Sequence, residues 1–162
     1  MDLVNILKDI ITEQTNSPIV FPLPRFSSGL NNYGQNRGTY THDAIDIPTG
    51  MGTPVFAPHN GTVLVADLYD SENTTYGSYA NCGGTIIIDS THYRTTFCHM
   101  SRMAVSRGQW VQAGDLVGYS GGQSGTAGAG RTEGPHLHWK LEVNGRTVNP
   151  IKWSSPQRMP NR

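Results

Sequence analysis

The stretch GPHLHWKLEVNGRTVNP, residues 134–150, places His136 and His138 one residue apart in a pattern typical of a β-strand. In a strand, the side chains at positions i and i+2 project from the same face, about 6–7 Å apart. Two imidazoles are therefore expected side by side, next to the bulky Trp139. Imidazole binds metals and transfers protons near neutral pH, so this strand is the first candidate for a functional site.

The chain around this strand, from about residue 40, alternates short β-prone segments with turns. Most segments are bounded by Gly, Pro, Asn or Asp, and they are rich in β-branched or aromatic residues. Strands are expected at AIDIP (44–48), TPVFA (53–57), GTVLVAD (61–67), GTIIID (84–89), YRTTFCHM (93–100), LVGYS (116–120) and HLHWKLEV (136–143). Seven strands in about a hundred residues predict a mainly β fold, an antiparallel sandwich or barrel-like core.

The composition narrows the class of protein. The 162 residues carry 12 Lys and Arg against 12 Asp and Glu, so the formal net charge is zero. A nucleic-acid-binding surface would need a basic excess, so nucleic acid is not expected as a partner. No apolar run is long enough to span a bilayer. Two cysteines, Cys82 and Cys98, are too few for a disulfide framework and match no zinc-finger spacing.

The N-terminal segment differs from the rest of the chain. Apolar residues recur at helical spacing over residues 2–14 and predict a short amphipathic helix, with Asp2 as N-cap. Three prolines in residues 16–26 predict an extended entry segment. We therefore divide the chain into an N-terminal helix and linker (1–20), one domain (21–153) and a tail (154–162). Asp2, Lys8 and Asp9 are unlike a secretory signal peptide, so we expect none.

The remaining histidines separate by context. His59 and His92 lie in turn-like segments and are expected to be ordinary surface residues. In THDAIDIP, a strand would place His42 and Asp46 on one face and bury the isoleucines on the other. Zn²⁺ accepts both ligand types, and a catalytic zinc site uses three protein ligands and an open position. The His-x-His strand can supply the third ligand, but spacing alone does not tell which of its histidines binds.

Five motifs in order resemble the lysostaphin-type (LytM-type) zinc endopeptidases, which cut peptide bonds in bacterial peptidoglycan. They run from about residue 38 to 150: HDAIDI, GTPVFAPHNGTV, YRTTFCHMS, GQWVQAGDLVGYSG and GPHLHWKLEVNGRTVNP. The chain departs from the family pattern at Ala44, which is often Gly, and at Trp139, which is more usually Phe. Neither departure removes a ligand or a histidine of the pattern.

The resemblance implies a site and an activity. It makes His42, Asp46 and His138 the zinc ligands, and His99 and His136 the catalytic pair. A bound Zn²⁺ lowers the pKa of its water towards neutrality, so no Ser or Cys nucleophile is required. The expected substrates are stem or cross-bridge peptides of peptidoglycan, and the glycine-rich loop 120–134 and segment 31–40 are expected to border the groove.

Two other hypotheses stay open. One is a non-enzymatic cell-wall binding or regulatory module that keeps the fold, although all five site residues are retained. The other is a component of a phage tail, joined to other tail proteins through the N-terminal helix. The absence of a recognisable signal peptide favours a virion-borne or lysis-released protein that acts on the cell wall from outside.

The two cysteines offer a further prediction. If GTIIID and YRTTFCHM form a hairpin that turns around residues 90–91, Cys82 and Cys98 lie opposite each other. Opposed residues have Cβ atoms about 4.5–5.5 Å apart, which is close to disulfide geometry. We expect a disulfide that braces the strand of His99, with the Cys98 sulfur turned away from the metal because successive strand residues alternate faces.

Overall fold

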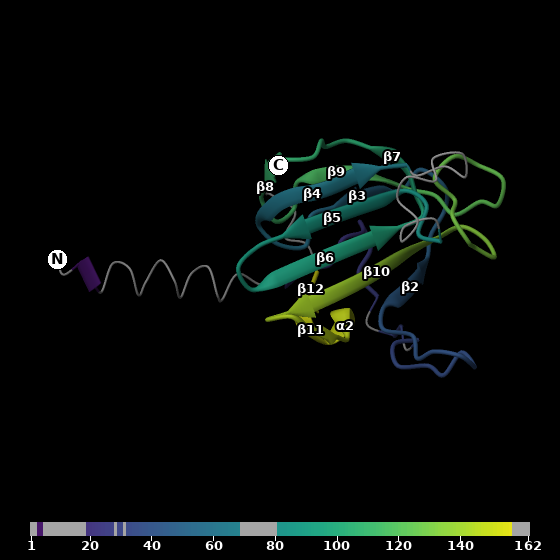
Figure 1. The fold of residues 1–162 in the computed structure, drawn as a ribbon, viewed down its shortest axis with the longest axis horizontal. Helices are drawn as coiled ribbons and strands as arrows, with labels where there is room; N and C mark the ends of the chain where they lie inside the picture. Colours follow the sequence, from purple (N-terminus) through teal and green to yellow (C-terminus); the bar gives the residue numbers. More distant parts are fainter. Residues whose placement is uncertain (1–2, 5–18, 28, 31, 69–80, 157–162) are drawn as a thin grey trace.

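Residues 136–143 form the longest strand of the computed structural model, which describes residues 3–4, 19–27, 29–30, 32–68 and 81–156 (Figure 1). This strand, β10 (His136–Val143), lies in a seven-stranded antiparallel sheet. Its sequence alternates buried and partly exposed residues, because one face of the sheet packs on the core. Leu137, Trp139 and Leu141 are fully buried.

The strand order of the large sheet is β11-β10-β6-β5-β4-β8, and β2 also pairs with β10. Its other members are β2 (Ile45–Pro48), β4 (Gly61–Asp67), β5 (Thr85–Asp89), β6 (Tyr93–Cys98), β8 (Trp110–Val111) and β11 (Arg146–Val148). β2 occupies the first half of the β10 edge and β11 the second half. The first half of β10, which carries His136 and His138, is therefore flanked by β6 on one side and β2 on the other.

A smaller sheet completes the core. It has the order β3-β9-β7 and comprises β3 (Pro54–Phe56), β7 (Met100–Met103) and β9 (Leu116–Ser120). Val55 and Val117 from this sheet belong to the same buried cluster as Ile86 and Ile88 of β5. The two sheets therefore share one hydrophobic core, which supplies most of the stabilisation of such a fold.

The two ends of the described domain meet. β1 (Ile19–Val20) pairs in parallel with β12 (Ser154–Ser155), which follows the short helix α2 (Pro150–Trp153). Ile19 and the neighbouring Phe21 are buried, and the Phe21 ring lies 6.1 Å from that of Trp139. Both segments are thereby fixed to the core beneath β10.

The fold class is confirmed as mainly β, with an open arrangement rather than a closed barrel. All seven expected strands are present, and those over 61–67, 116–120 and 136–143 have the expected bounds. The strand expected over 93–100 is interrupted at His99, whose φ of 63° lies in the left-handed region. The helix expected over residues 2–14 lies almost wholly outside the described residues, and that hypothesis and the domain division stay predictions. In the described part of the chain, no helix has the length and apolar character needed to cross a membrane.

Candidate metal centre and catalytic cleft

The site lies at the edge of the large sheet where β6 ends and β10 begins, on the right in Figure 1. The antiparallel register places His138 of β10 opposite Asp46 of β2 and opposite Cys98 of β6. Residues opposed in this way share one face of a sheet. Three strands thus present Asp46, His138 and Cys98 in a row, and His136 shares that face two residues earlier on β10.

Three side chains converge on one point. The Nδ1 atom of His138 lies 2.8 Å from Oδ1 of Asp46, and Nε2 of His42 lies 3.3 Å from Oδ2 of Asp46. One ligand atom from each of these residues lies within 4.8 Å of the others. The expected metal ligands are therefore brought together, although His42 precedes β2 instead of lying within it.

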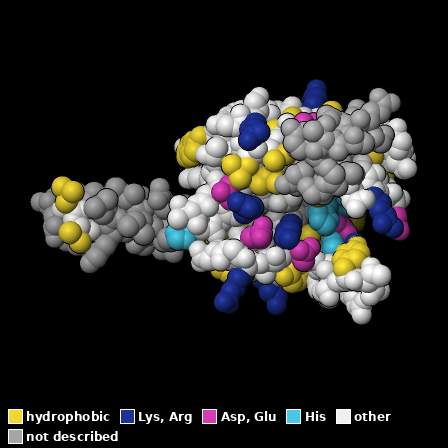
Figure 2. Space-filling model, in the orientation of Figure 1, with side chains coloured by type: hydrophobic (Ala, Val, Ile, Leu, Met, Phe, Trp, Pro, Cys, Tyr) yellow, Lys and Arg dark blue, Asp and Glu magenta, His cyan; other side chains and the backbone are white. Residues whose placement is uncertain are grey.

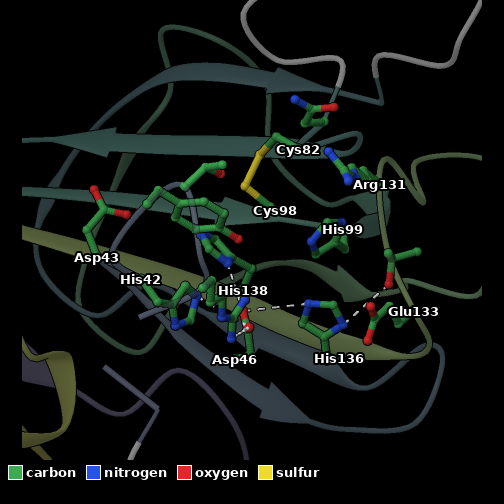
Figure 3. A pocket seen from close by; sticks show the side chains of 15 residues that line it. His42, Asp43, Asp46, Cys82, Cys98, His99, Arg131, Glu133, His136 and His138 are labelled. Carbon is green, nitrogen blue, oxygen red and sulfur yellow. Dashed lines mark hydrogen bonds and ion pairs between the residues drawn. A yellow bond between two sulfur atoms is a disulfide. The ribbon is translucent and has the colours of Figure 1, made fainter. Parts of the chain in front are cut away.

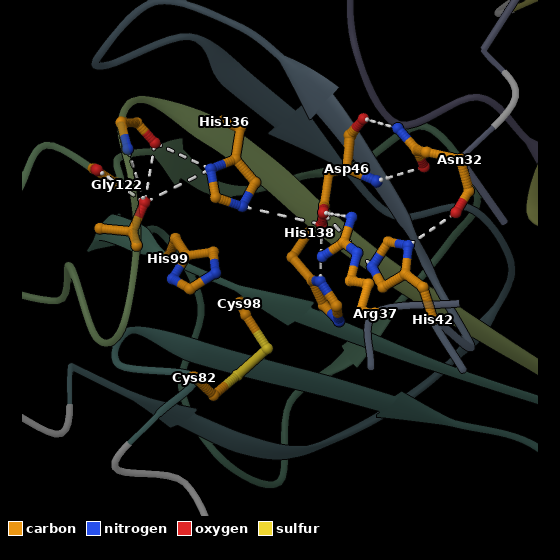
Figure 4. Close-up of polar contacts among 12 residues, drawn as sticks. Asn32, Arg37, His42, Asp46, Cys82, Cys98, His99, Gly122, His136 and His138 are labelled. Carbon is orange, nitrogen blue, oxygen red and sulfur yellow. Dashed lines mark hydrogen bonds and ion pairs between the residues drawn. A yellow bond between two sulfur atoms is a disulfide. The ribbon is translucent and has the colours of Figure 1, made fainter. Parts of the chain in front are cut away.

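Asn32 orients two of these ligands (Figure 4). Its carbonyl accepts a hydrogen bond from Nδ1 of His42 at 2.8 Å, so the proton is on Nδ1 and the lone pair is on Nε2. Its side-chain amide donates to the Asp46 carbonyl at 2.7 Å and accepts from the Asp46 backbone N–H at 3.0 Å. Outer-shell partners of this kind fix the orientation of metal ligands.

A cation fits these donor atoms. Nε2 of His42 is buried and has no hydrogen-bond partner among the described residues, yet it faces a carboxylate oxygen. A buried nitrogen lone pair beside a carboxylate is unfavourable unless a positive charge joins them. Two imidazoles and one carboxylate are donor types that Zn²⁺ accepts, and three protein ligands are the usual number where one position stays open.

Asp46 is ionised in this environment. Burial alone would raise its pKa, but hydrogen bonds from His138 and Arg37 hold the pKa well below its ordinary value of 3.8. Nη2 of Arg37 donates to Oδ2 of Asp46 at 2.7 Å. The charged form of Asp46 is the form that binds a metal.

His99 and His136 lie beside this cluster. Their ring centroids are 4.5 Å apart, and the His99 ring lies 6.0 Å from that of His138. Nδ1 of His99 donates to the Ala129 carbonyl at 2.7 Å, which places the lone pair of the neutral ring on Nε2. Burial lowers the pKa of His99 from 6.5 to about 4, against the effect of the Ala129 hydrogen bond, so this imidazole is neutral near pH 7.

The glycine-rich loop fixes His136. Nδ1 of His136 donates to the Gly134 carbonyl at 2.8 Å, and its Nε2 lies 3.7 Å from Oδ1 of Asp46. The hydroxyl of Thr132 lies within hydrogen-bond distance of the carbonyls of Gly122 and Gly134, at 3.0 and 2.8 Å, which closes the end of this loop. Both histidines therefore have Nδ1 bound to a carbonyl and Nε2 available.

All five site residues line one cleft of about 1140 Å³ (Figure 3). Segment 31–40 contributes Arg37, Thr39 and Tyr40 to its wall, and the glycine-rich loop contributes residues 131–133. Both expected borders of the groove are confirmed at these positions. Figure 2 shows histidine side chains exposed on this side of the molecule, with acidic and basic side chains around them.

The structure contains the expected disulfide between Cys82 and Cys98, but two details of the expectation are wrong. Ile86 lies opposite Phe97, so Cys82 is not directly opposed to Cys98 and reaches it from the turn before β5. The Cys98 sulfur also does not point away from the metal centre, since Cys98 lines the cleft with His99. Successive side chains do not alternate between the two faces at Cys98 and His99, because His99 adopts a left-handed conformation.

The expectation that His59 is a surface residue is also wrong. It is 1% exposed, with Nδ1 donating to the Asn60 carbonyl at 2.8 Å and Nε2 accepting from the Thr95 hydroxyl at 3.1 Å. Burial lowers its pKa, because the charged form would lose its hydration. Its turn-like sequence gave no sign that the neighbouring strands cover it. His92 is partly exposed and pairs with the Asn144 side chain at 2.9 Å.

Comparisons with known proteins show which family this chain belongs to. The model of Peptidase family M23 matches residues 40–150. The chain belongs to this family. The M23 domain is 34% identical over 116 residues to the peptidoglycan DD-endopeptidase ShyA of Vibrio cholerae, a match covering 71% of this chain and 23% of ShyA. It is 33% identical over 124 residues to lysostaphin of Staphylococcus staphylolyticus, covering 71% of this chain and 23% of lysostaphin. The resemblance to lysostaphin-type peptidases is thus confirmed, and the matched region spans about a quarter of these relatives' length.

Solved structures show the same fold. A zinc-containing peptidase of Vibrio cholerae superposes with a TM-score of 0.63 at 24% identity, covering 83% of this chain and 39% of that one. The catalytic domain of lysostaphin from Staphylococcus simulans gives a TM-score of 0.56 at 23% identity, covering 82% and 87%. These similarities support the architecture of the M23 domain.

Two residues beside the site, both N-terminal to the region that the family model matches, were not found by reasoning from the sequence. Asn32 and Arg37 lie in NNYGQNRGTY, a segment without secondary-structure periodicity or ligand spacing. Their contacts with Asp46 arise because residues 32–37 fold back against β2. Nothing in the sequence marks either residue as a partner of the metal ligands.

Proposed function

We propose that this chain is a zinc-dependent endopeptidase that hydrolyses peptide bonds in bacterial peptidoglycan. The convergence of His42, Asp46 and His138 at the bottom of an open cleft, beside two further imidazoles, carries the proposal. Its matches to peptidoglycan peptidases support the substrate class. A non-enzymatic wall-binding module would need no such set of groups.

His42, Asp46 and His138 would hold the metal. A zinc ion in such a site polarises a carbonyl and makes water nucleophilic near neutral pH. His42 is oriented by Asn32 and Asp46 is held in its charged form, so the chain keeps the donor set arranged for binding. Hydrolysis breaks the C–N bond, and the oxygen of water becomes part of the new carboxyl group.

His99 and His136 would handle the protons of this reaction. One proton must leave the attacking water and one must reach the departing amine nitrogen. Neutral His99 presents a free Nε2 to the cleft and can accept a proton, and the imidazole of His136 lies beside it. Each positioned acid or base typically contributes about 10²–10⁴ in rate.

The first test separates ligands from catalytic residues. Purified protein is expected to bind about one zinc per chain, measured by mass spectrometry of the metal. His138→Ala and Asp46→Ala are expected to lose both zinc and activity on purified peptidoglycan. His99→Ala and His136→Ala are expected to keep zinc and lose most turnover. Zinc loss in His136→Ala but not in His138→Ala would reverse the assignment of the pair.

The second test identifies the bond. Peptidoglycans with glycine bridges and with direct D-alanyl–diamino acid cross-links are digested separately, and the fragments are identified by mass spectrometry. New amino and carboxyl termini at one defined bond are expected. No fragments from any wall type, with zinc bound, would contradict the proposed activity.

The site of action follows from the substrate and the disulfide. Disulfides persist in oxidising compartments, so we propose that the protein works outside the cytoplasm, at the cell wall. Delivery by a phage virion, with the N-terminal segment bound to tail proteins, is the finer form of this proposal. Detection of the chain in purified virions by mass spectrometry would test it.

A further inference from the structure

Arg131 is a positively charged residue of the cleft that contacts none of the proposed metal ligands. It is exposed and lines the cleft with His99 and His136 (Figure 3). No hydrogen bond or ion pair joins its guanidinium group to another residue in the described ranges. A positively charged group left free in a substrate cleft is suited to bind an anionic group of the ligand.

The backbone beneath Arg131 is fixed. Its N–H donates to the Asn81 carbonyl at 2.9 Å. A Cβ at the preceding Gly130 would lie 2.6 Å from the same carbonyl oxygen, so only glycine permits this close approach. Segment 81–83 is in turn joined to β6 through the disulfide of Cys82. Arg131 thus projects from a preorganised support, which reduces the entropy lost when it binds a ligand.

Other charges of the cleft do not neutralise Arg131. Asp43 pairs with Lys140 at 2.7 Å, and Asp46 pairs with Arg37. Glu133 is exposed and lies next to Gly134, which holds His136, and no ion pair joins Glu133 to Arg131. The anion that complements Arg131 would therefore come from the substrate.

The position of Arg131 indicates which part of the substrate it meets. Nδ1 of His99 bonds the carbonyl of Ala129, two residues before Arg131, so the proposed catalytic histidines and Arg131 occupy the same end of the cleft. Arg37 lies at the other side of the ligand cluster, against Asp46. The departing nitrogen must lie near the histidine that protonates it, either His99 or His136. Because Arg131 is at the same end of the cleft, it lies on the side of the leaving amine.

We propose that Arg131 selects substrates with a free carboxylate on the carbon that bears the scissile nitrogen. This inference rests on the proposed peptidase function and specifies its substrate class. A D-alanyl–diamino acid cross-link meets the requirement when the second carboxyl group of the diamino acid is free. An internal glycine bridge does not, and neither does the same cross-link with that carboxyl group amidated. Guanidinium–carboxylate pairs are strong because two parallel hydrogen bonds add to the charge attraction.

The test uses two cross-linked peptides that differ only in this carboxyl group, free in one and amidated in the other. The zinc-loaded full chain is expected to cleave the acid with a kcat/KM about 10- to 100-fold above that of the amide, the effect of one charged hydrogen-bonded pair. Arg131→Gln is expected to bring that ratio close to one by slowing cleavage of the acid alone. Its unchanged rate on the amide shows that the variant is folded. Arg107→Gln, at an exposed turn outside the cleft, serves as the matched control and is expected to keep the wild-type ratio.

Binding supplies a readout that does not depend on turnover. In the His136→Ala background, calorimetry is expected to show tighter binding of the acid than of the amide, and the added Arg131→Gln is expected to remove the difference. Equal kcat/KM and equal binding for both peptides, with or without Arg131, would overturn the inference while leaving the peptidase function intact. Absence of any wall-peptide cleavage would instead contradict the function, and the binding difference would still decide the role of Arg131.

Discussion

Removal of the Cys82–Cys98 disulfide is expected to affect both stability and catalysis. The bridge closes a loop with a sequence separation of 16. For a loop of this length, the chain-entropy model gives a stabilisation of about 3 kcal/mol, from restriction of the unfolded chain. In a domain of this size, that corresponds to a fall in Tm of roughly 6–12 °C. Cys82→Ala/Cys98→Ala is therefore expected to melt by about that much below the oxidised wild type.

The catalytic effect has a separate cause. The carbonyl of Cys82 accepts the backbone N–H of His99 at 2.8 Å, and Cys98 precedes His99 in the chain. Without the bridge, the turn over 81–84 is less restricted, and His99 loses part of its support. We expect lower turnover on peptidoglycan with unchanged zinc content.

Thermal unfolding is followed by the fluorescence of the tryptophans, with and without a reducing agent. Reductant is expected to lower the Tm of the wild type to that of the double variant, which itself does not respond. Titration of thiols in denatured, unreduced protein is expected to find none free. Two free thiols in protein from an oxidising compartment, or a wild-type Tm indifferent to reductant, would refute the reasoning.

Three further predictions concern other parts of the fold. The lowered pKa of His59 means that protonation favours the unfolded state, so stability is full above the ordinary pKa of 6.5 and is lost as the pH falls below it. His59→Gln is expected to lose less unfolding free energy than the wild type between pH 7.5 and 5.5 in urea titrations, and an equal loss in the two proteins would contradict this. Asn32→Ala removes two hydrogen bonds to the backbone of Asp46 and is expected to weaken zinc binding about 10- to 100-fold in chelator competition; an unchanged affinity would show that Asn32 does not orient the ligands. Gly84→Ala would place a Cβ in collision with the Met100 carbonyl oxygen and is therefore expected to lower Tm. An unchanged Tm would mean that the backbone at residues 84 and 100 can move apart at no cost.

Much of the proposed metal site could be located from the sequence because strand periodicity is local. Alternation along β10 places His136 and His138 on one face whatever the rest of the chain does. It also buries Ile45 and Ile47 and turns Asp46 to the opposite face, as observed. The assignment of His138 rather than His136 as a proposed metal ligand came from the family resemblance, because both members of the pair satisfy the spacing.

The course of the chain around His99 required the tertiary structure. Alternation predicts that Cys98 and His99 face opposite ways, and it fails where φ turns positive. Nothing in YRTTFCHM indicates that conformation, which goes with hydrogen bonds from His99 to Cys82 and Ala129, both distant in sequence. The burial of His59 also required the tertiary structure, because the strands that cover this residue lie elsewhere in the sequence.

The sequence by itself determined seven of the strands, the sheet face that carries the site and the family. Only the tertiary structure decided that Asn32 and Arg37 fold back onto Asp46 and that the disulfide lines the cleft. It also decided that Arg131 projects from a fixed loop into that cleft without a partner among the described residues. The physical reason is that strand periodicity acts over neighbouring residues, whereas loop positions depend on long-range hydrogen bonds and packing that no local pattern specifies.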